Sequence, residues 1–160
     1  LKSYLSINSN IKKIFLINTN LNIMGKNNTI LNQENITQLK INLKLHRKKT
    51  IQKFMYEVLR HSKYLKQELI MLNKIYNDSC WPSNNELIKN LEYMETFQHN
   101  IENIQRDIIL INSENDIFND MEYLERLDNK FIQKKTVKDA GHLPFISRNK
   151  EIYSLIENLI

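Results

Sequence analysis

Apolar positions along the chain follow two alternating patterns. Short runs that are almost continuously apolar, bounded by polar turns, predict buried β-strands; they lie at 11–18, 107–112 and 131–137. Apolar residues that recur at helical spacing predict amphipathic helices at about 36–97, 119–129 and 150–159. Residues 1–7 resemble the end of a helix, and the Asn-rich segment 19–35 is predicted as a loop. Strands separated by helices predict an α/β fold with three parallel strands.

The segment 36–97 is long enough for three or four helices. The apolar positions Ile51, Met55, Val58 and Leu59 share one helical face. A break follows at Trp81-Pro82, and the next helix opens with the capping-box pattern Ser83-Asn-Asn-Glu86. This segment is therefore predicted to be a helical insertion between the first and second strands.

Composition narrows the class of protein. The 160 residues are 41% hydrophobic, with only two Gly and two Pro, which favours one domain rich in helix over an all-β fold. Residues 1–100 carry 15 basic and 7 acidic side chains, whereas residues 101–160 carry 8 and 11. The single cysteine, Cys80, allows no internal disulfide and no cysteine metal cluster. No apolar run is long enough for a membrane span, and we expect a cytoplasmic protein that needs no metal and no cofactor.

Polar residues suited to catalysis follow the second and third strands. Asp116 ends the turn after the strand 107–112, and His142 follows Gly141 in a small-residue turn after the third strand. Ligands of parallel sheets bind at the carboxyl ends of the strands, and a carboxylate that orients a histidine is two thirds of a catalytic triad. A surface aspartate and a structural turn histidine are the ordinary alternative for any such pair.

The residues around both positions resemble the α/β-hydrolase family. Ile-Leu-Ile-Asn-Ser-Glu-Asn-Asp (109–116) is similar to the strand and turn that carry the family's acid, with Ser113 where glycine is common. Ala-Gly-His-Leu-Pro-Phe-Ile-Ser (140–147) is similar to its histidine turn, and Pro-Phe-Ile-Ser is closest to the pimeloyl-[acyl-carrier protein] methyl ester esterases of biotin synthesis. The segment 11–18 resembles the family's sixth strand.

The resemblance implies the C-terminal part of an α/β-hydrolase. Residues 1–35 and 98–160 would form a partial core, and 36–97 a helical lid inserted between strands six and seven. It implies ester hydrolysis with His142 as general base and acid and Asp116 as its partner. No Gly-x-Ser-x-Gly nucleophile elbow occurs, since the two glycines are Gly25 and Gly141. We therefore expect a fragment of a longer or split hydrolase, inactive alone, whose serine comes from an N-terminal half.

A basic cluster in the insertion is the candidate surface for a partner. Lys40, Lys44 and Arg47 have the spacing of one helical face. The cluster also includes Lys48, Lys49 and Lys53, and no acid lies between Glu34 and Glu57. A solvated helix face is the ordinary explanation. The esterase resemblance implies docking of an acidic acyl carrier protein that delivers a small acyl ester. Nucleic acid is disfavoured because no aromatic residues alternate with these cations.

Other residues leave alternatives open. Apolar residues of the insertion could pack or line an acyl channel: Phe54, Met55, Leu59, Leu69, Met71, Leu72 and Trp81. His46, His61 and His99 lack metal-ligand spacing, and Cys80 has no histidine arranged around it. Related hydrolases cleave thioesters or carbon–carbon bonds, so these reactions are alternatives to ester hydrolysis. A further alternative is that the chain is no enzyme but a helical module that binds an acidic partner.

Overall fold

The computed structural model describes residues 10–20, 32–96, 101 and 104–160. The predicted helix end at 1–7 lies outside the described residues, as do most of the predicted loop 19–35 and much of the connector before the second strand.

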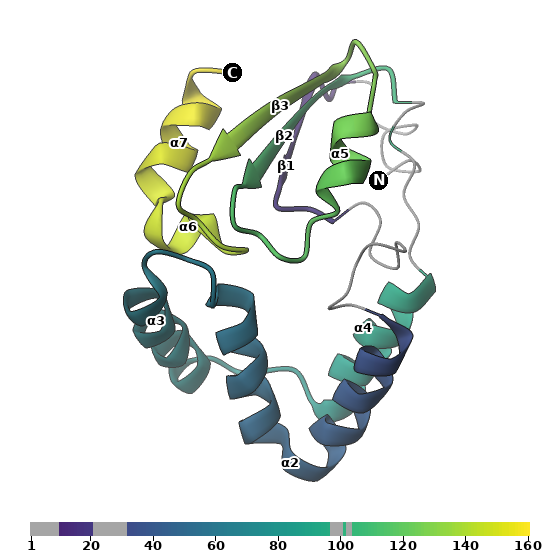
Figure 1. The fold of residues 1–160 in the computed structure, drawn as a ribbon, viewed down its shortest axis with the longest axis vertical. Coiled ribbons are helices and arrows are strands. Elements are labelled where there is room, and N and C mark those ends of the chain that lie inside the picture. The colour runs from purple at the N-terminus through teal and green to yellow at the C-terminus, as the bar shows by residue number, and fades with distance from the viewer. Residues whose placement is uncertain (1–9, 21–31, 97–100, 102–103) are drawn as a thin grey trace.

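A parallel sheet of three strands forms the upper half of the described chain (Figure 1). The strands are β1 (Lys13–Ile17), β2 (Asp107–Ser113) and β3 (Ile132–Val137), in the order β1-β2-β3. Phe15 lies opposite Ile109, which in turn lies opposite Gln133. The three predicted strands and their parallel pairing are confirmed.

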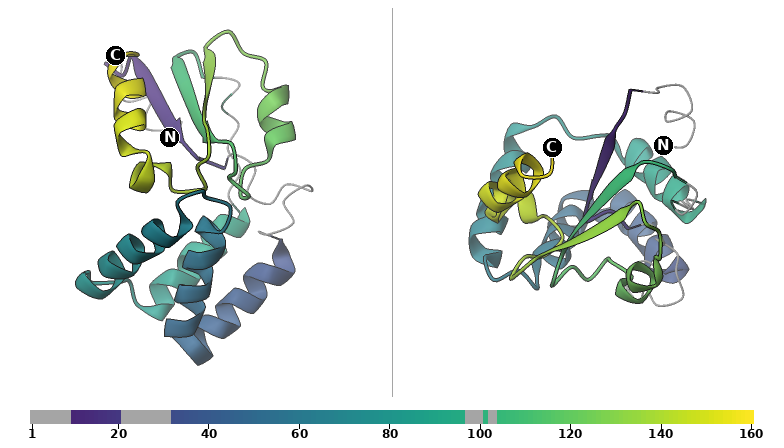
Figure 2. Two further views of the ribbon diagram at one scale, coloured as in Figure 1. Left: turned by 60° about the vertical axis from the view of Figure 1, so that its left-hand side comes forward. Right: turned by 90° about the horizontal axis from the view of Figure 1, so that it is seen from above.

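The central strand is buried on both faces because its side chains alternate between two apolar clusters. Ile108 and Leu110 pack with Leu124 of α5 (Met121–Arg126), whereas Ile109 and Ile111 pack with Ile152 of α7 (Asn149–Glu157). Figure 2 shows these helices on opposite faces of the sheet, an α/β/α arrangement. Met121, at the start of α5, is 42% exposed and does not join these clusters.

The remaining helices form a block beyond the carboxyl ends of the strands (Figure 1). The helical block consists of α2 (Gln33–Leu59), α3 (Leu65–Asp78) and α4 (Asn84–Thr96). Helix α2 begins three residues before the predicted start, because the side chain of Asn32 accepts a hydrogen bond from the Asn35 N–H at 2.8 Å and caps it. None of the helices in the described part of the chain has the length and apolarity that crossing a membrane would require.

Helix α2 bends sharply at His46, which has non-helical backbone angles. Polar side chains bind carbonyl oxygens in the turn before the bend: Thr50 Oγ1 donates to Asn42 O at 3.0 Å and to His46 O at 2.9 Å, and Asn84 Nδ2 donates to Leu43 O at 2.9 Å. A threonine that bonds a carbonyl four residues back is a known cause of helix bending. The two legs of α2 form a V that opens toward the sheet (Figure 1).

The bend at His46 interrupts the helical face that Lys40, Lys44 and Arg47 were predicted to share. Arg47 lies past the bend and donates to Asn84 Oδ1 and to the carbonyl of Pro82, and Lys40 forms a 2.7 Å ion pair with Glu95 of α4. These two cations hold α4 against α2, whereas Lys44 and Lys48 are exposed. The four residues therefore do not share one free surface.

The predicted capping box at the start of α4 is confirmed. The hydroxyl and the N–H of Ser83 both donate to Glu86 Oε2 at 2.7 Å, and the Glu86 N–H donates back to Ser83 Oγ at 3.3 Å. The hydrogen bonds from the Ser83 hydroxyl and then its N–H lower the pKa of the Glu86 carboxyl from its ordinary value.

We expect Ser83→Ala to raise the Glu86 pKa toward its ordinary value, measured by NMR titration of the carboxyl. A lowered folded-state pKa stabilises the fold above the unfolded pKa, and this stabilisation is lost as the pH falls through the folded pKa. The variant should therefore unfold at a lower temperature than wild type at pH 7, with a smaller difference in acid. Ser79→Ala, at an exposed serine just past α3, is the control; an equal effect there would contradict the capping role.

Candidate active site

Two loops at the carboxyl ends of β2 and β3 are joined through their backbones. We call residues 114–119 the acid loop and 138–143 the histidine loop. The Glu114 N–H donates to Val137 O at 2.9 Å, and the Asn115 N–H donates to Ala140 O at 3.1 Å. The backbone of the histidine loop turns at Asp139. The φ of this residue is 58°, in the left-handed region that Asp tolerates better than most residues. The bonds continue the parallel pairing past the strands and bring the two loops together.

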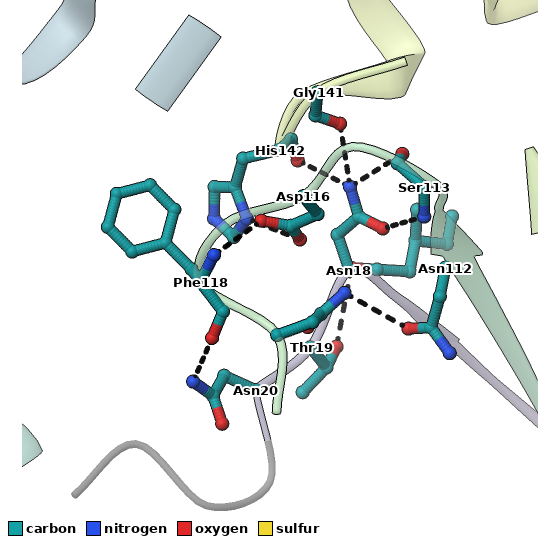
Figure 3. A network of polar contacts seen from close by, with 11 residues as sticks. Asn18, Thr19, Asn20, Asn112, Ser113, Asp116, Phe118, Gly141 and His142 are labelled. Carbon is teal, nitrogen blue, oxygen red and sulfur yellow. Dashed lines mark hydrogen bonds and ion pairs between the residues drawn. The ribbon is translucent and has the colours of Figure 1, made fainter. Parts of the chain in front are cut away.

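Asp116 and His142 meet at this junction (Figure 3). His142 Nδ1 lies 2.9 Å from Asp116 Oδ2, and the other carboxylate oxygen accepts the Phe118 N–H at 2.9 Å. The Asp116 side chain is fully buried, whereas that of His142 is 27% exposed. A carboxylate only accepts hydrogen bonds, so the proton between the two groups belongs to Nδ1. Neutral His142 then has an unprotonated Nε2, the nitrogen that can take up a proton.

Phe118 forms one wall of the site. Its ring lies 4.9 Å from the His142 ring, centroid to centroid, and 6.1 Å from the ring of Phe54 in α2. Because Phe118 is buried and its N–H binds Asp116, the acid loop fixes the ring and the carboxylate together. The sequence pattern had singled out Phe54 but not Phe118.

Asn18, just past β1, binds both the last residue of β2 and the histidine loop (Figure 3). Its Nδ2 lies within hydrogen-bond distance of Ser113 Oγ at 2.8 Å, Gly141 O at 3.0 Å and His142 O at 2.8 Å. Its Oδ1 accepts the Ser113 N–H at 2.6 Å. The backbone of Asn18 has a φ of 43°, in the left-handed region where Asn is enriched among non-glycine residues. Sequence reasoning missed this role; the only local signal was an Asn directly after a buried strand.

The helical block touches the histidine loop through the turn between α2 and α3. The His142 N–H donates to Val58 O at 3.4 Å, and the Lys63 N–H donates to Asp139 O at 3.2 Å. Beyond the loop lies α6 (Pro144–Ser147), a single turn that the sequence pattern did not predict. Its Ser147 hydroxyl donates to the carboxylate of Glu68 in α3, a residue only 1% exposed. The block and the histidine loop are therefore packed as one unit.

A cavity of about 510 Å³ lies within the V of α2. Both legs of the helix line it, and Phe118 closes the side toward His142. Of the apolar residues considered for an acyl channel, Phe54 lines this cavity. The others pack into clusters between the helices or, for Met71, are exposed.

The remaining candidate residues have other surroundings. His61 accepts from Arg60 Nε at 3.0 Å, His46 lines the cavity at the bend, and His99 lies outside the described residues. Within the described ranges, no group of three or more His, Cys, Asp or Glu is arranged to hold a metal ion. In the same ranges no hydroxyl or thiol is hydrogen-bonded to the His142 ring.

No family model matches the sequence, and no curated protein matches it. Solved structures do share the fold. A thermophilic esterase from Thermogutta terrifontis, with malate bound, aligns with 92% of the chain at a TM-score of 0.63 and 13% identity. The chain has the fold of the C-terminal part of an α/β-hydrolase. The 2-hydroxy-6-oxo-6-phenylhexa-2,4-dienoate hydrolase of Rhodococcus sp. strain RHA1 aligns with 92% of the chain at a TM-score of 0.54 and 11% identity.

The chain spans 54% of the length of each of these two structures. The three helices α2–α4 form the segment between β1 and β2.

Asn18→Ala should destabilise the fold by about 3 kcal/mol, because it leaves polar groups at the end of β2 and in the histidine loop unpaired. Urea unfolding measures the loss, and the imidazole signals of His142 in NMR should shift as the histidine loop loosens. Asn77→Ala, at an exposed position of α3, should change stability by less than about 0.5 kcal/mol. A loss no larger at Asn18 than at Asn77 would rule out the bridging role.

Gly141 has room for one methyl group and no more. A Cβ placed there would lie 3.4 Å from Ser62 Cβ and 3.5 Å from Val58 O, which are ordinary contacts. Gly141→Ala should cost less than about 1 kcal/mol, whereas Gly141→Val should cost about 1–3 kcal/mol more, because its extra methyl groups meet the α2–α3 turn. Urea unfolding and hydrogen exchange of the His142 N–H test this; equal behaviour of the two variants would contradict the close packing.

Proposed function

We propose that this chain is the C-terminal part of a serine-type hydrolase that cleaves a small acyl ester. The observation that carries the proposal is the contact between buried Asp116 and partly exposed His142 at neighbouring strand ends. A buried carboxylate beside a histidine with one free nitrogen is the arrangement that proton transfer to and from a nucleophile requires.

His142 Nε2 accepts the proton of a serine hydroxyl as the serine oxygen attacks the ester carbonyl. The resulting imidazolium is stabilised by Asp116, to which Nδ1–H continues to donate. The same proton then passes from Nε2 to the oxygen of the leaving alcohol as the acyl–oxygen bond breaks. A water molecule, deprotonated in the same way, releases the acid and restores the serine.

The serine and the oxyanion donors of this proposal come from an N-terminal half of the same hydrolase. The sequence contains no Gly-x-Ser-x-Gly, and both structural neighbours are nearly twice as long as the aligned part. Among the described strands, β1 is paired on one edge only, as the order β1-β2-β3 shows. An unpaired strand edge is a ready template for another strand, which supports a further strand beside β1.

The helical block acts as the lid of this site, and the substrate is the methyl ester of a carrier-bound pimeloyl chain. The position of the block over the strand ends and its cavity support a lid role. Lys44 and Lys48 are exposed, as docking of an acidic carrier protein requires, whereas Lys40 pairs with α4 and Arg47 binds the segment at its start. Thioester or carbon–carbon bond cleavage is the second candidate, favoured by the likeness to the Rhodococcus hydrolase.

Hydrolysis of p-nitrophenyl butyrate by the full-length reading frame, or by this chain with a supplied N-terminal half, tests the triad. His142→Ala should lower kcat/KM by about 10³–10⁴-fold, because both proton transfers are lost. Asp116→Asn should cause a similar loss, since it removes the acceptor that fixes the tautomer. His61→Ala, outside the site, is the matched control and should retain activity.

Activity that is unchanged in His142→Ala would overturn the proposal. So would a full reading frame that lacks a nucleophile elbow and shows no hydrolysis, which would favour the non-catalytic module.

A further inference from the structure

The cavity within the V of α2 combines an apolar wall with uncompensated positive charge. Phe54 and Phe118 form the wall toward His142, and Ile36 and Leu39 come from the other leg of the helix. The cations lining it are Lys49, Lys53 and Arg60.

The charge of two of these cations is not neutralised by the described part of the chain. Glu57 is the acid among the described lining residues, and it forms a 3.0 Å ion pair with Arg60. No carboxylate within the described ranges lies at salt-bridge distance from Lys49 or Lys53. These lysines are four positions apart on one helix, where like charges repel and destabilise the helix unless an anion lies between them.

We propose that this cavity binds the anionic end of an amphipathic acyl group, with a carboxylate or phosphate held by Lys49 and Lys53. The acyl chain lies against Phe54 and Phe118, and Phe118 brings the chain to His142. The substrate class is therefore a small ester whose acyl group has a negative charge at its far end, and it differs from the carrier-bound pimeloyl ester, whose far end is joined to the carrier. This assignment of a substrate rests on the proposed hydrolytic function, whereas binding of the anion does not.

The dimensions favour a small molecule over a macromolecule. A volume of about 510 Å³ is typical of sites for small ligands. Lys44 and Lys48 belong to the same helix, are exposed and do not line the cavity. They repeat the four-residue spacing of Lys49 and Lys53 and provide a matched control of equal charge.

Isothermal titration calorimetry of the full chain with octanoate, octyl phosphate and neutral octanamide tests the site. Both anions or one of them should bind at least tenfold more tightly than octanamide, and the tighter one identifies the headgroup. Lys49→Gln/Lys53→Gln should remove this difference, whereas Lys44→Gln/Lys48→Gln should change affinity by less than twofold. Phe54→Ala should weaken all three ligands. Circular dichroism checks that each variant is folded.

Equal binding of octanamide and the anions would overturn the proposal, as would equal losses in the two double variants or no binding of any ligand. His142→Ala should retain the preference for octanoate over octanamide, which separates this site from the triad. Intact octanoate binding without hydrolysis would refute the proposed reaction and leave the anion site standing. If His142→Ala abolishes hydrolysis but wild type does not bind octanoate, the anion site is refuted and the proposed reaction stands.

Discussion

One asparagine side chain holds three separate parts of this chain in register. Asn18 follows the edge strand β1, yet it contacts Ser113 at the end of the central strand and the carbonyls of Gly141 and His142 beyond β3. Those groups are buried, so each must find a partner inside the protein. The geometry of Asp116 and His142 depends on this bridge, because the strands fix the loops only at their bases.

The strands and helices follow from local patterns that the sequence makes plain. Ile108 to Ile111 are continuously apolar because both faces of β2 are covered, and Ser83 with Glu86 marks the start of α4. The positions of Asp116 and His142 after their strands, together with parallel pairing, were enough to predict that the two would meet. Single short patterns with one clear physical cause are thus reliable guides here.

Features set by distant contacts could not be predicted in this way. Asn18 and His142 are 124 positions apart, and no spacing rule connects them. The bend at His46 involves neither Pro nor Gly, and it depends on where Thr50 and Asn84 place their polar atoms. The single turn α6 has four residues, too few for a helical period to be visible. The cavity is a product of the bend, so its lining could not be assembled from the sequence.

The long separation between Asn18 and its partners also bears on the order of folding. The contacts between the helices of the block are closer in the sequence, such as Lys40 with Glu95, whereas the bridge closes loops of 95 to 124 residues. Closing a long loop costs more chain entropy than closing a short one, and non-local contacts slow folding. We therefore expect the helical block to become structured first, with the histidine loop docking onto it and onto Asn18 late in the reaction. The site would be assembled only as the fold is completed, and a partly folded chain would have no paired Asp116 and His142.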